Sequence, residues 1–436
     1  MVNKSDMRLL LCVFYLSVMN VVWSRSADAE LTNLRGEYLG QQPPGNKPEP
    51  FVPALFSVWS DRGFHLKSSV YFSPDGTELF FTNQTLPVVP GRSCSIWFMQ
   101  QRDSTWTEPQ IASFSSDYCD QLTHYAADGS RIFFVSKRPV DSRGAPEDSD
   151  IWYATRSNGG WAEPYRVDYP INTTSNETGA VLNRDGSMFF SSDRPGGSGG
   201  FDLYQTRIIN GTFTEPLNLG ESVNTGAEEH VVCAAPDVNF LIVYRVDISN
   251  TADAGLYITY READGSWTRA RSMGDHINGR SATGASVSPD GRYLFVLSHG
   301  NGIYWLKIDL IEYLKDNSLN ISDTLIETLL HEGLEAALAT CVRLREKHSD
   351  YVDVDELLLN QRGHQLLDAN RMIEAIALFQ ISVALFPGSW NAFDSLGEAY
   401  LKARQVELAV QCYEQSLELN PNNTNAVEML RKLRKE

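Results

Sequence analysis

Short stretches that alternate apolar and polar residues fill the middle of the chain, and turn-forming residues separate them. The clearest copy runs from residue 183 to residue 220. Residues 187–191 are rich in aromatic side chains and residues 201–207 alternate, which is typical of half-buried β-strands. The glycine-rich segment between them can only form a loop. We therefore expect three short strands here, followed by a fourth that begins near Phe213.

The same pattern recurs at a nearly constant period. Each copy carries an aspartate at a tight turn, usually followed by glycine, which accepts the positive φ that such turns need. A period of this length, with about four strands per copy, is the signature of a β-propeller. The turn aspartates are Asp75, Asp128, Asp185, Asp237 and Asp290.

The first strand of this region predicts how the propeller closes. An aromatic residue and a Glu-Pro pair precede the fourth strand of most copies, but the fifth copy lacks this element. A Glu-Pro strand at residues 49–57 stands at the beginning instead, so we expect it to complete the fifth blade. Closure of this kind removes two exposed sheet edges. The prediction is an all-β propeller of five blades over residues 48–310, with a sixth, degenerate blade as the alternative.

The pattern becomes helical after residue 309. Leucines at helical spacing over residues 323–348, interrupted by Gly333, predict a helical hairpin. Beyond it, Gly363 and Gly397 repeat at the 34-residue period of tetratricopeptide units, in which small residues lie where two helices touch. We expect a linker over residues 311–322 and an α-helical tetratricopeptide-type domain over residues 323–436, with a final capping helix at residues 424–435.

The first residues have the features of an export signal. Lys4 and Arg8 precede an apolar run, and Ala27 and Ala29 fit a small-residue cleavage site. The run is short for a membrane span, so we favour cleavage over a retained anchor. We therefore predict a signal peptide over residues 1–29 and a polar, extended lead-in over residues 30–47. The protein would be exported, periplasmic or extracellular, with no transmembrane segment after cleavage.

The net charge and the cysteine content argue against some classes of partner and cofactor. The formal net charge of −18 argues against nucleic acid or anionic lipid as the main partner, because both would be repelled. Five cysteines lie outside the apolar run, and this odd, widely spread set is not a disulfide framework. Cys94 and Cys119 fall in neighbouring strands and could pair, although buried free thiols are the favoured interpretation. Without a Cys-x-x-Cys pair or metal-ligand spacing, we expect no metal and no cofactor.

Two regions resemble known repeat families. Ser-Pro-Asp-Gly at residues 73–76 and 288–291, and the Arg-Pro-Gly-Gly loop with Phe-Asp-Leu-Tyr inside residues 191–204, resemble the WD40-like (TolB-like, PD40-type) propeller repeat of exported bacterial proteins. Residues 394–400 and 416–421 resemble a tetratricopeptide repeat (TPR). The first propeller copy departs from its family in residues 84–92. Both resemblances imply protein interaction rather than a defined chemistry.

One motif could indicate catalysis, but its context does not support that function. Residues 196–200 match G-x-S-x-G, the pattern of a nucleophile elbow. That elbow needs a strand, a sharp turn and then a helix. Here two strands flank the motif, so we interpret it as a loop and expect no catalytic residue.

Charged residues recur where the first strand of a copy begins. Acids stand eight residues before three of the turn aspartates, and arginines follow the corresponding second strands. Because first strands line the channel of a propeller, these residues could form a polar rim that binds a cation, a sugar or a peptide end. Ion pairs between blades are the alternative, which we favour because ion-pair networks often mimic sites. The candidate ligand-binding residues are Asp120, Glu177, Glu229, Arg138, Arg194 and Arg245.

Two further sets of side chains recur with regular spacing. Aromatic residues occupy one position of each third strand, which favours packing between blades over a sugar-stacking platform. They are Trp97, Trp152, Tyr204, Tyr257 and Tyr304. In the tail, four polar residues share one helical face, which suits either partner binding or a solvated surface. They are Asn391, Asp394, Glu398 and Lys402.

Together these features predict an exported, non-enzymatic scaffold. The TPR groove and a propeller face would bind a protein or peptide partner, with a cell-envelope glycan as a further candidate, and the protein would not bind nucleic acid. The alternative is a carbohydrate-active enzyme or sugar-binding propeller that uses the acids at the channel mouth. Five-bladed propellers do host glycosidases, which need two carboxylates about 5–10 Å apart across the substrate.

Overall fold

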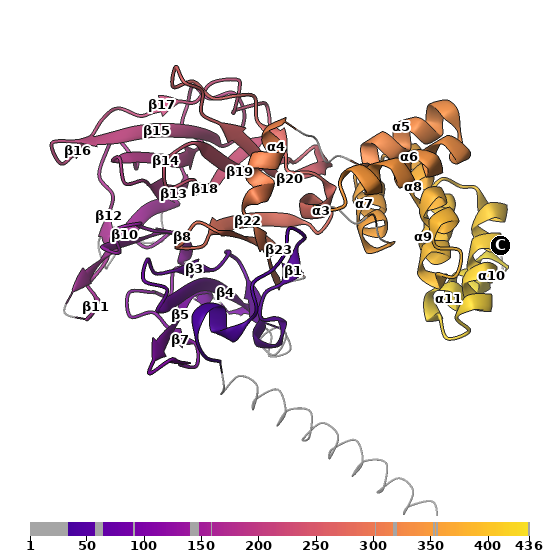
Figure 1. Cartoon of the computed structure of the whole chain (residues 1–436), viewed down its shortest axis with the longest axis horizontal. Coiled ribbons are helices and arrows are strands. Elements are labelled where there is room, and N and C mark those ends of the chain that lie inside the picture. The colour runs from indigo at the N-terminus through magenta and orange to yellow at the C-terminus, as the bar shows by residue number, and fades with distance from the viewer. Residues whose placement is uncertain are drawn as a thin grey trace, which may run out of the picture.

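The computed structural model describes residues 34–56, 64–89, 92–139, 148–157, 159–300, 302–316, 321–351, 354 and 356–434. The predicted signal peptide lies outside the described residues. A propeller of five antiparallel sheets is followed by a tail of paired helices, as Figure 1 shows. The predicted fold class, a five-bladed propeller with a TPR-type tail, is confirmed.

Each blade is an antiparallel sheet whose strands follow one another outward from the channel. Blade 1 consists of β2 (Phe64–Leu66), β3 (Tyr71–Phe72), β4 (Glu78–Val89), β5 (Arg92–Arg102), β6 (Thr105–Trp106) and β7 (Gln110–Ile111). Blade 2 consists of β8 (Gln121–Tyr125), β9 (Arg131–Ser136), β10 (Asp150–Ser157), β11 (Gly160–Trp161) and β12 (Tyr165–Arg166). Blade 3 consists of β13 (Glu177–Leu182), β14 (Ser187–Ser192), β15 (Asp202–Ile209), β16 (Thr212–Phe213) and β17 (Leu217–Asn218).

The remaining two blades have four strands each. Blade 4 consists of β18 (Glu228–Ala234), β19 (Phe240–Asp247), β20 (Asn250–Tyr260) and β21 (Arg271–Ser272). Blade 5 consists of β22 (Ala282–Val287), β23 (Tyr293–Ser298), β24 (Gly302–Lys307) and the N-terminal β1 (Glu49–Pro50). The inner strands of blades 5 and 1 meet through the hydroxyls of Ser69 and Ser286, 3.0 Å apart, so the ring of inner strands is closed.

The N-terminal strand completes blade 5, as predicted. Glu49 and Pro50 pair with the third strand of that blade, and the Phe51 amide donates to the carbonyl of Ile303 at 2.8 Å. The predicted extent of the strand was wrong, because residues 53–56 are helical rather than extended. The chain turns after Pro50 because Phe51 enters the core, where its ring lies 5.1 Å from the ring of Trp305.

The segment before β1 packs against the propeller rather than running extended over it. Residues Glu37–Gly40 form a short 3-10 turn, η1. The ring of Tyr38 is buried between Phe72 and Tyr293, and its hydroxyl donates to Asp290 at 2.9 Å. These contacts join the N-terminal segment to blades 1 and 5, so residues far apart in the sequence hold the closing seam of the ring.

The tail is a stack of helix pairs. A short helix, α4 (Asp309–Asp316), leaves the propeller, and the predicted hairpin bends at Gly333, where φ is 91°. A Cβ atom on Gly363 would lie 2.4 Å from the ring of Phe379, which explains the glycine of the repeat. The stack consists of α5 (Ile321–Glu332), α6 (Leu334–Lys347), α7 (Glu356–Asp368), α8 (Met372–Leu385), α9 (Trp390–Lys402), α10 (Val406–Leu419) and α11 (Thr424–Leu433).

The tail docks on blades 4 and 5 through a continuous hydrophobic core and buried polar contacts. Arg362 of α7 is buried and forms ion pairs with Asp253 at 3.2 Å and Asp323 at 3.3 Å. Asp275, in the short helix α3 (Asp275–Asn278), accepts a hydrogen bond from the backbone amide of Ser322. Across the described residues, no helix is both long and apolar enough to span a lipid bilayer.

Candidate functional site

The three candidate acids form ion pairs with the three candidate arginines. Each pair lies within one blade, so the favoured interpretation of pairs between blades was wrong in this respect. The nitrogen–oxygen distances are 2.7 Å for Arg138–Asp120, 3.3 Å for Arg194–Glu177 and 2.9 Å for Arg245–Glu229. All three acidic side chains are 0% exposed, so they offer no surface to a ligand in this conformation.

The same networks hold the loop that enters each blade. Glu177 accepts hydrogen bonds from the amide and hydroxyl of Thr173, and Glu229 accepts the equivalent pair from Thr225. Arg194 also donates to the carbonyl of Ile171 in its loop at 2.6 Å. Burial raises the pKa of Glu177, although these hydrogen bonds and the Arg194 charge oppose the shift. The geometry therefore supports a structural role for the acids, and ligand binding by them stays a prediction.

The recurring aromatic residues lie beside these arginines. The guanidinium of Arg138 lies 5.3 Å from the ring centre of Trp152, and that of Arg194 lies 5.0 Å from Tyr204. Arg245 lies 4.3 Å from the ring of Tyr257. A cation over an aromatic face is attracted by the ring quadrupole. Packing is therefore the observed role of these rings in blades 2–4, and the arginines are part of it.

The channel wall is formed by the residues that follow the acids. Successive side chains of a strand point to opposite faces, so the residue after a buried acid points into the channel. A cavity of about 430 Å³ lies at this end of the channel. One residue from each blade, seven positions before its turn aspartate, lines it: Ser68, Gln121, Thr178, His230 and Thr283. In the sequence, this ring stands one position after the ring of charged candidate residues.

The channel wall is polar at this mouth. The hydroxyl of Thr178 lies 3.0 Å from Nδ1 of His230, whose ring is held 4.7 Å from the ring of Phe201. Burial lowers the pKa of His230, and Glu228, 3.6 Å from Nε2, opposes that shift. A second cavity of about 310 Å³ lies at the opposite end of the inner strands, beside His124 and Asn183.

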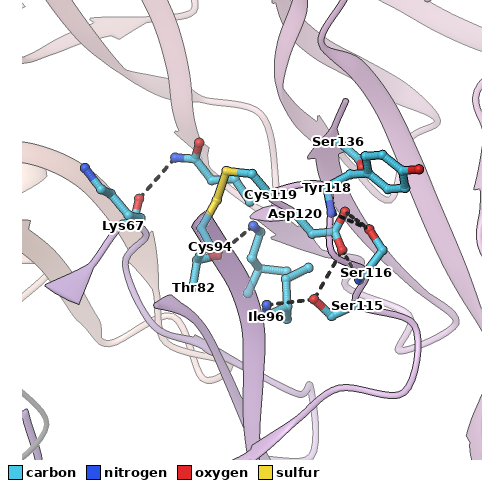
Figure 2. The surroundings of a disulfide bond; sticks show 12 residues. Lys67, Thr82, Cys94, Ile96, Ser115, Ser116, Tyr118, Cys119, Asp120 and Ser136 are labelled. Atoms are coloured by element: carbon cyan, nitrogen blue, oxygen red, sulfur yellow. Dashed lines mark hydrogen bonds between the residues drawn. A yellow bond between two sulfur atoms is a disulfide. The ribbon is translucent and has the colours of Figure 1, made fainter. Parts of the chain in front are cut away.

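Cys94 and Cys119 form a disulfide, although free thiols were the favoured interpretation. The bond joins β5 of blade 1 to the loop that enters blade 2, and the two Cα atoms are 4.4 Å apart. Figure 2 shows the disulfide next to Asp120 and its hydrogen-bonded partners, with Lys67 beyond it. The remaining described cysteines, Cys233, Cys341 and Cys412, are buried and free. The odd cysteine count did not indicate this disulfide, because three of the five cysteines are buried thiols that form no disulfide.

The four candidate residues of the tail lie on α9, and two of them contact neighbouring helices. Asn391 donates to Glu356 of α7 at 3.4 Å. Asp394 accepts a hydrogen bond from Asn425 of α11 at 2.8 Å. Glu398 and Lys402 form an ion pair with each other at 2.9 Å. The first helices of successive repeats, α7, α9 and α11, therefore present one joined polar surface, which we call the TPR groove.

No group of three or more histidine, cysteine or acidic side chains within the described ranges is arranged to hold a metal ion. The expectation that the protein uses no cofactor stays a prediction.

Comparison with known proteins identifies the repeat in the tail. The family model described as tetratricopeptide repeat matches residues 395–423. The tetratricopeptide repeat domain-containing protein PYG7, chloroplastic, of Arabidopsis thaliana is 34% identical over 64 residues, which is 15% of this chain and 21% of that protein. The chain thus matches about one fifth of the length of this curated relative. The C-terminal tail is a TPR module, a class that presents extended surfaces for protein–protein interaction.

Solved structures similar to each part have low overall similarity. The first TPR domain of human RPAP3 is 21% identical, with a TM-score of 0.19, and the match covers 26% of this chain and 87% of that one. The alpha-L-arabinofuranosidase from Lactobacillus brevis is 14% identical, with a TM-score of 0.34, and the match covers 54% of this chain and 85% of that one. Neither likeness bears on function, and the architecture rests on the strand pairing described above.

Proposed function

We propose that this protein is an exported, non-enzymatic scaffold that binds a peptide segment of a partner protein in the TPR groove. The observation that carries the proposal is the joined polar surface of α7, α9 and α11, mounted on a propeller through a buried interface. A rigid mount fixes the direction in which the groove faces. The propeller thus serves as a base, with faces of its own available for binding.

The repeat period defines which side chains line the groove. Residues at 34-residue spacing from the α9 positions occupy the same places on the neighbouring helices. Lys402 and Lys432 are each paired with a glutamate one turn earlier on the same helix, at 2.9 and 2.7 Å. The groove has four acidic side chains against these two lysines, so its net charge is negative and it suits a basic peptide. Its positions are Leu357, Asn360, His364, Asp368, Asn391, Asp394, Glu398, Lys402, Asn425, Glu428 and Lys432.

Two observations support export. The first 29 residues have the pattern of a cleaved signal, and the chain contains a disulfide, which forms and persists in oxidising compartments. Intact-mass measurement of the protein purified from the periplasm or medium tests this proposal. The expected mass is that of a chain beginning at Glu30 with two fewer hydrogens, and recovery of the full-length chain in the cytosol would contradict export.

The carbohydrate-active alternative is less well supported. A glycosidase needs two carboxylates that reach the substrate. The three candidate acids are buried behind the channel wall, and the lining of the adjacent cavity contains neither aspartate nor glutamate. A hydrolysis screen with aryl glycosides would test this alternative, and turnover that disappears in Glu177→Gln would support it against our proposal.

Charge reversal in the groove tests the scaffold directly. Tagged protein would be used to capture partners from the exported fraction, and each identified partner would then be titrated against purified variants. Glu398→Lys should weaken binding at least tenfold, because it places a cation opposite a basic peptide. Glu407→Lys, an equal charge change on an exposed site of α10, should leave binding unchanged. Partners that bind both variants as tightly as the wild type would contradict the groove as the binding site.

A further inference from the structure

The cavity at the channel mouth has a composition unlike the rest of the protein. The chain carries a net charge of −18, yet the cavity lining contains no carboxylate. It does contain Lys67, His230 and His299. Its volume of about 430 Å³ is within the range of about 300–1,000 Å³ that is usual for small-molecule sites.

Lys67 stands at the position that the buried acids occupy in blades 2–4, eight residues before the turn aspartate. The register differs in blade 1, because β2 ends at Leu66 and the buried hydroxyl of Ser68 accepts the Thr82 amide at 2.8 Å.

The acidic residues nearest the channel do not neutralise the basic side chains of the cavity lining. Asp120, Glu177 and Glu229 lie behind the wall, each bound to its own arginine. Glu228 lies 3.6 Å from His230 but outside the lining. No ion pair joins Lys67 to an acid within the described part of the chain. An anion that enters this mouth therefore meets a lysine without an adjacent carboxylate.

Polar groups from three further blades face the same cavity. The Gln121 amide bridges to the backbone carbonyl of Lys67 at 3.1 Å, which fixes the position of the lysine segment. Thr178 and Thr283 contribute hydroxyls from blades 3 and 5. A ligand that reaches all of these groups must carry several hydrogen-bonding groups of its own. Leu66, Val135 and Leu297 supply apolar patches between them, as is usual in ligand sites.

We infer that the channel mouth binds a small polyhydroxylated molecule that carries a carboxylate or phosphate group. Lys67 pairs with the anionic group, and Gln121, Thr178 and Thr283 bond to the hydroxyls. This site is independent of the TPR groove, so one can fail experimentally while the other stands.

Calorimetric titration of the full mature chain tests the site. The probes are glucuronate as the carboxylate, glucose 6-phosphate as the phosphate, and glucose as the neutral control. We expect at least one anion to bind with a Kd below about 1 mM and glucose to bind at least tenfold more weakly. Which of the two anions binds more tightly distinguishes the carboxylate from the phosphate as the preferred group.

Single substitutions distinguish anion binding at the channel mouth from general electrostatic attraction of anions to the protein surface. Lys67→Gln should weaken binding of the anion at least tenfold, whereas Lys307→Gln, an exposed lysine on β24, should not change it. Thr283→Val supplies an independent variant of the wall, and it should weaken binding several-fold. The inference is overturned if neither anion binds, if glucose binds as tightly as both anions, or if Lys67→Gln and Lys307→Gln behave alike.

Discussion

Asp120 and Gln121 are neighbours in the chain, yet their side chains have different surroundings. Asp120 is fully buried, paired with Arg138 and bonded to the loop that enters its blade, whereas Gln121 is exposed at the channel mouth. The same contrast separates Glu177 from Thr178 in the next blade. Strand alternation thus gives the inner strands of blades 2 and 3 one residue that stabilises the blade and one residue that faces the channel.

Blade 5 extends the comparison, because it lacks the buried acid. Ala282 stands at the equivalent position, and no arginine follows the second strand of this blade. Its stabilising contacts come from outside the repeat, through β1, Tyr38 and Phe51. Blades 2–4 are stabilised by residues of their own repeat, while the closing blade depends on the N-terminus.

The largest effect should follow from opening the seam. Phe51→Ala removes a fully buried ring from contact with Phe295 and Trp305, so we expect it to lower the free energy of unfolding by about 4 kcal/mol. Denaturant unfolding measures this change. Leu217→Ala, at a side chain that is 71% exposed, should change it by less than about 0.5 kcal/mol. Equal effects of the two substitutions would show that the N-terminal segment does not stabilise the ring.

A somewhat smaller effect should follow from breaking one internal network. Arg194→Ala leaves Glu177 buried without its cation, which should cost about 3 kcal/mol of unfolding free energy. Arg207→Ala is the matched control, because that side chain is half exposed and 3.9 Å from Asp185. It should cost less than about 0.5 kcal/mol. If Arg194→Ala hardly changed the free energy of unfolding, the residues on the buried face of the strand would not stabilise the blade more than those that face the channel.

The Cys94–Cys119 disulfide should contribute less to the free energy of unfolding than either Phe51 or Arg194. The double variant Cys94→Ala, Cys119→Ala opens a link between residues 25 apart, and we expect a loss of about 2 kcal/mol. Reductant should lower the unfolding midpoint of the wild type but not that of the double variant. If reductant shifts both proteins equally, the bond does not account for the effect.

The smallest predicted effect is a change in the pH dependence of stability when His230, which lines the channel, is replaced. Burial lowers the pKa of His230 in the folded protein, so the unfolded chain binds more protons below its ordinary pKa of about 6.5. The stability that neutral His230 contributes is complete above that pH and falls as the pH is lowered. His230→Gln should therefore lose less stability than the wild type between about pH 7 and pH 5. Thr283→Val should keep the wild-type profile, and parallel profiles for all three proteins would contradict this assignment.

Much of the fold could be predicted because it follows from repeated local patterns. The turn aspartates and the 34-residue spacing of Gly363 and Gly397 indicated the blades and the helix pairs. The closing strand could be inferred because the fifth copy lacked its own. The early end of that strand could not, since it depends on Phe51 entering a core formed by distant blades.

The site was harder to predict than the fold. Four of the five copies carry a charged residue eight positions before the turn aspartate, which suggests a binding site. The next position contains Gln121, Thr178 and His230, which share no single chemistry. Which of the two faces the channel depends on where each inner strand begins, and these strands contain β-bulges that shift the register. The Cys94–Cys119 bond likewise required the loop entering blade 2 to bring the two side chains together.

The division of roles along one strand can be measured directly with the adjacent pair Asp120 and Gln121. Alanine substitution of each residue, followed by denaturant unfolding, compares the two faces under the same conditions. The structure predicts that Asp120→Ala loses about 3 kcal/mol, since Arg138 is left without its partner, and that Gln121→Ala changes stability by less than about 0.5 kcal/mol. Equal losses, or a larger loss for Gln121→Ala, would contradict it.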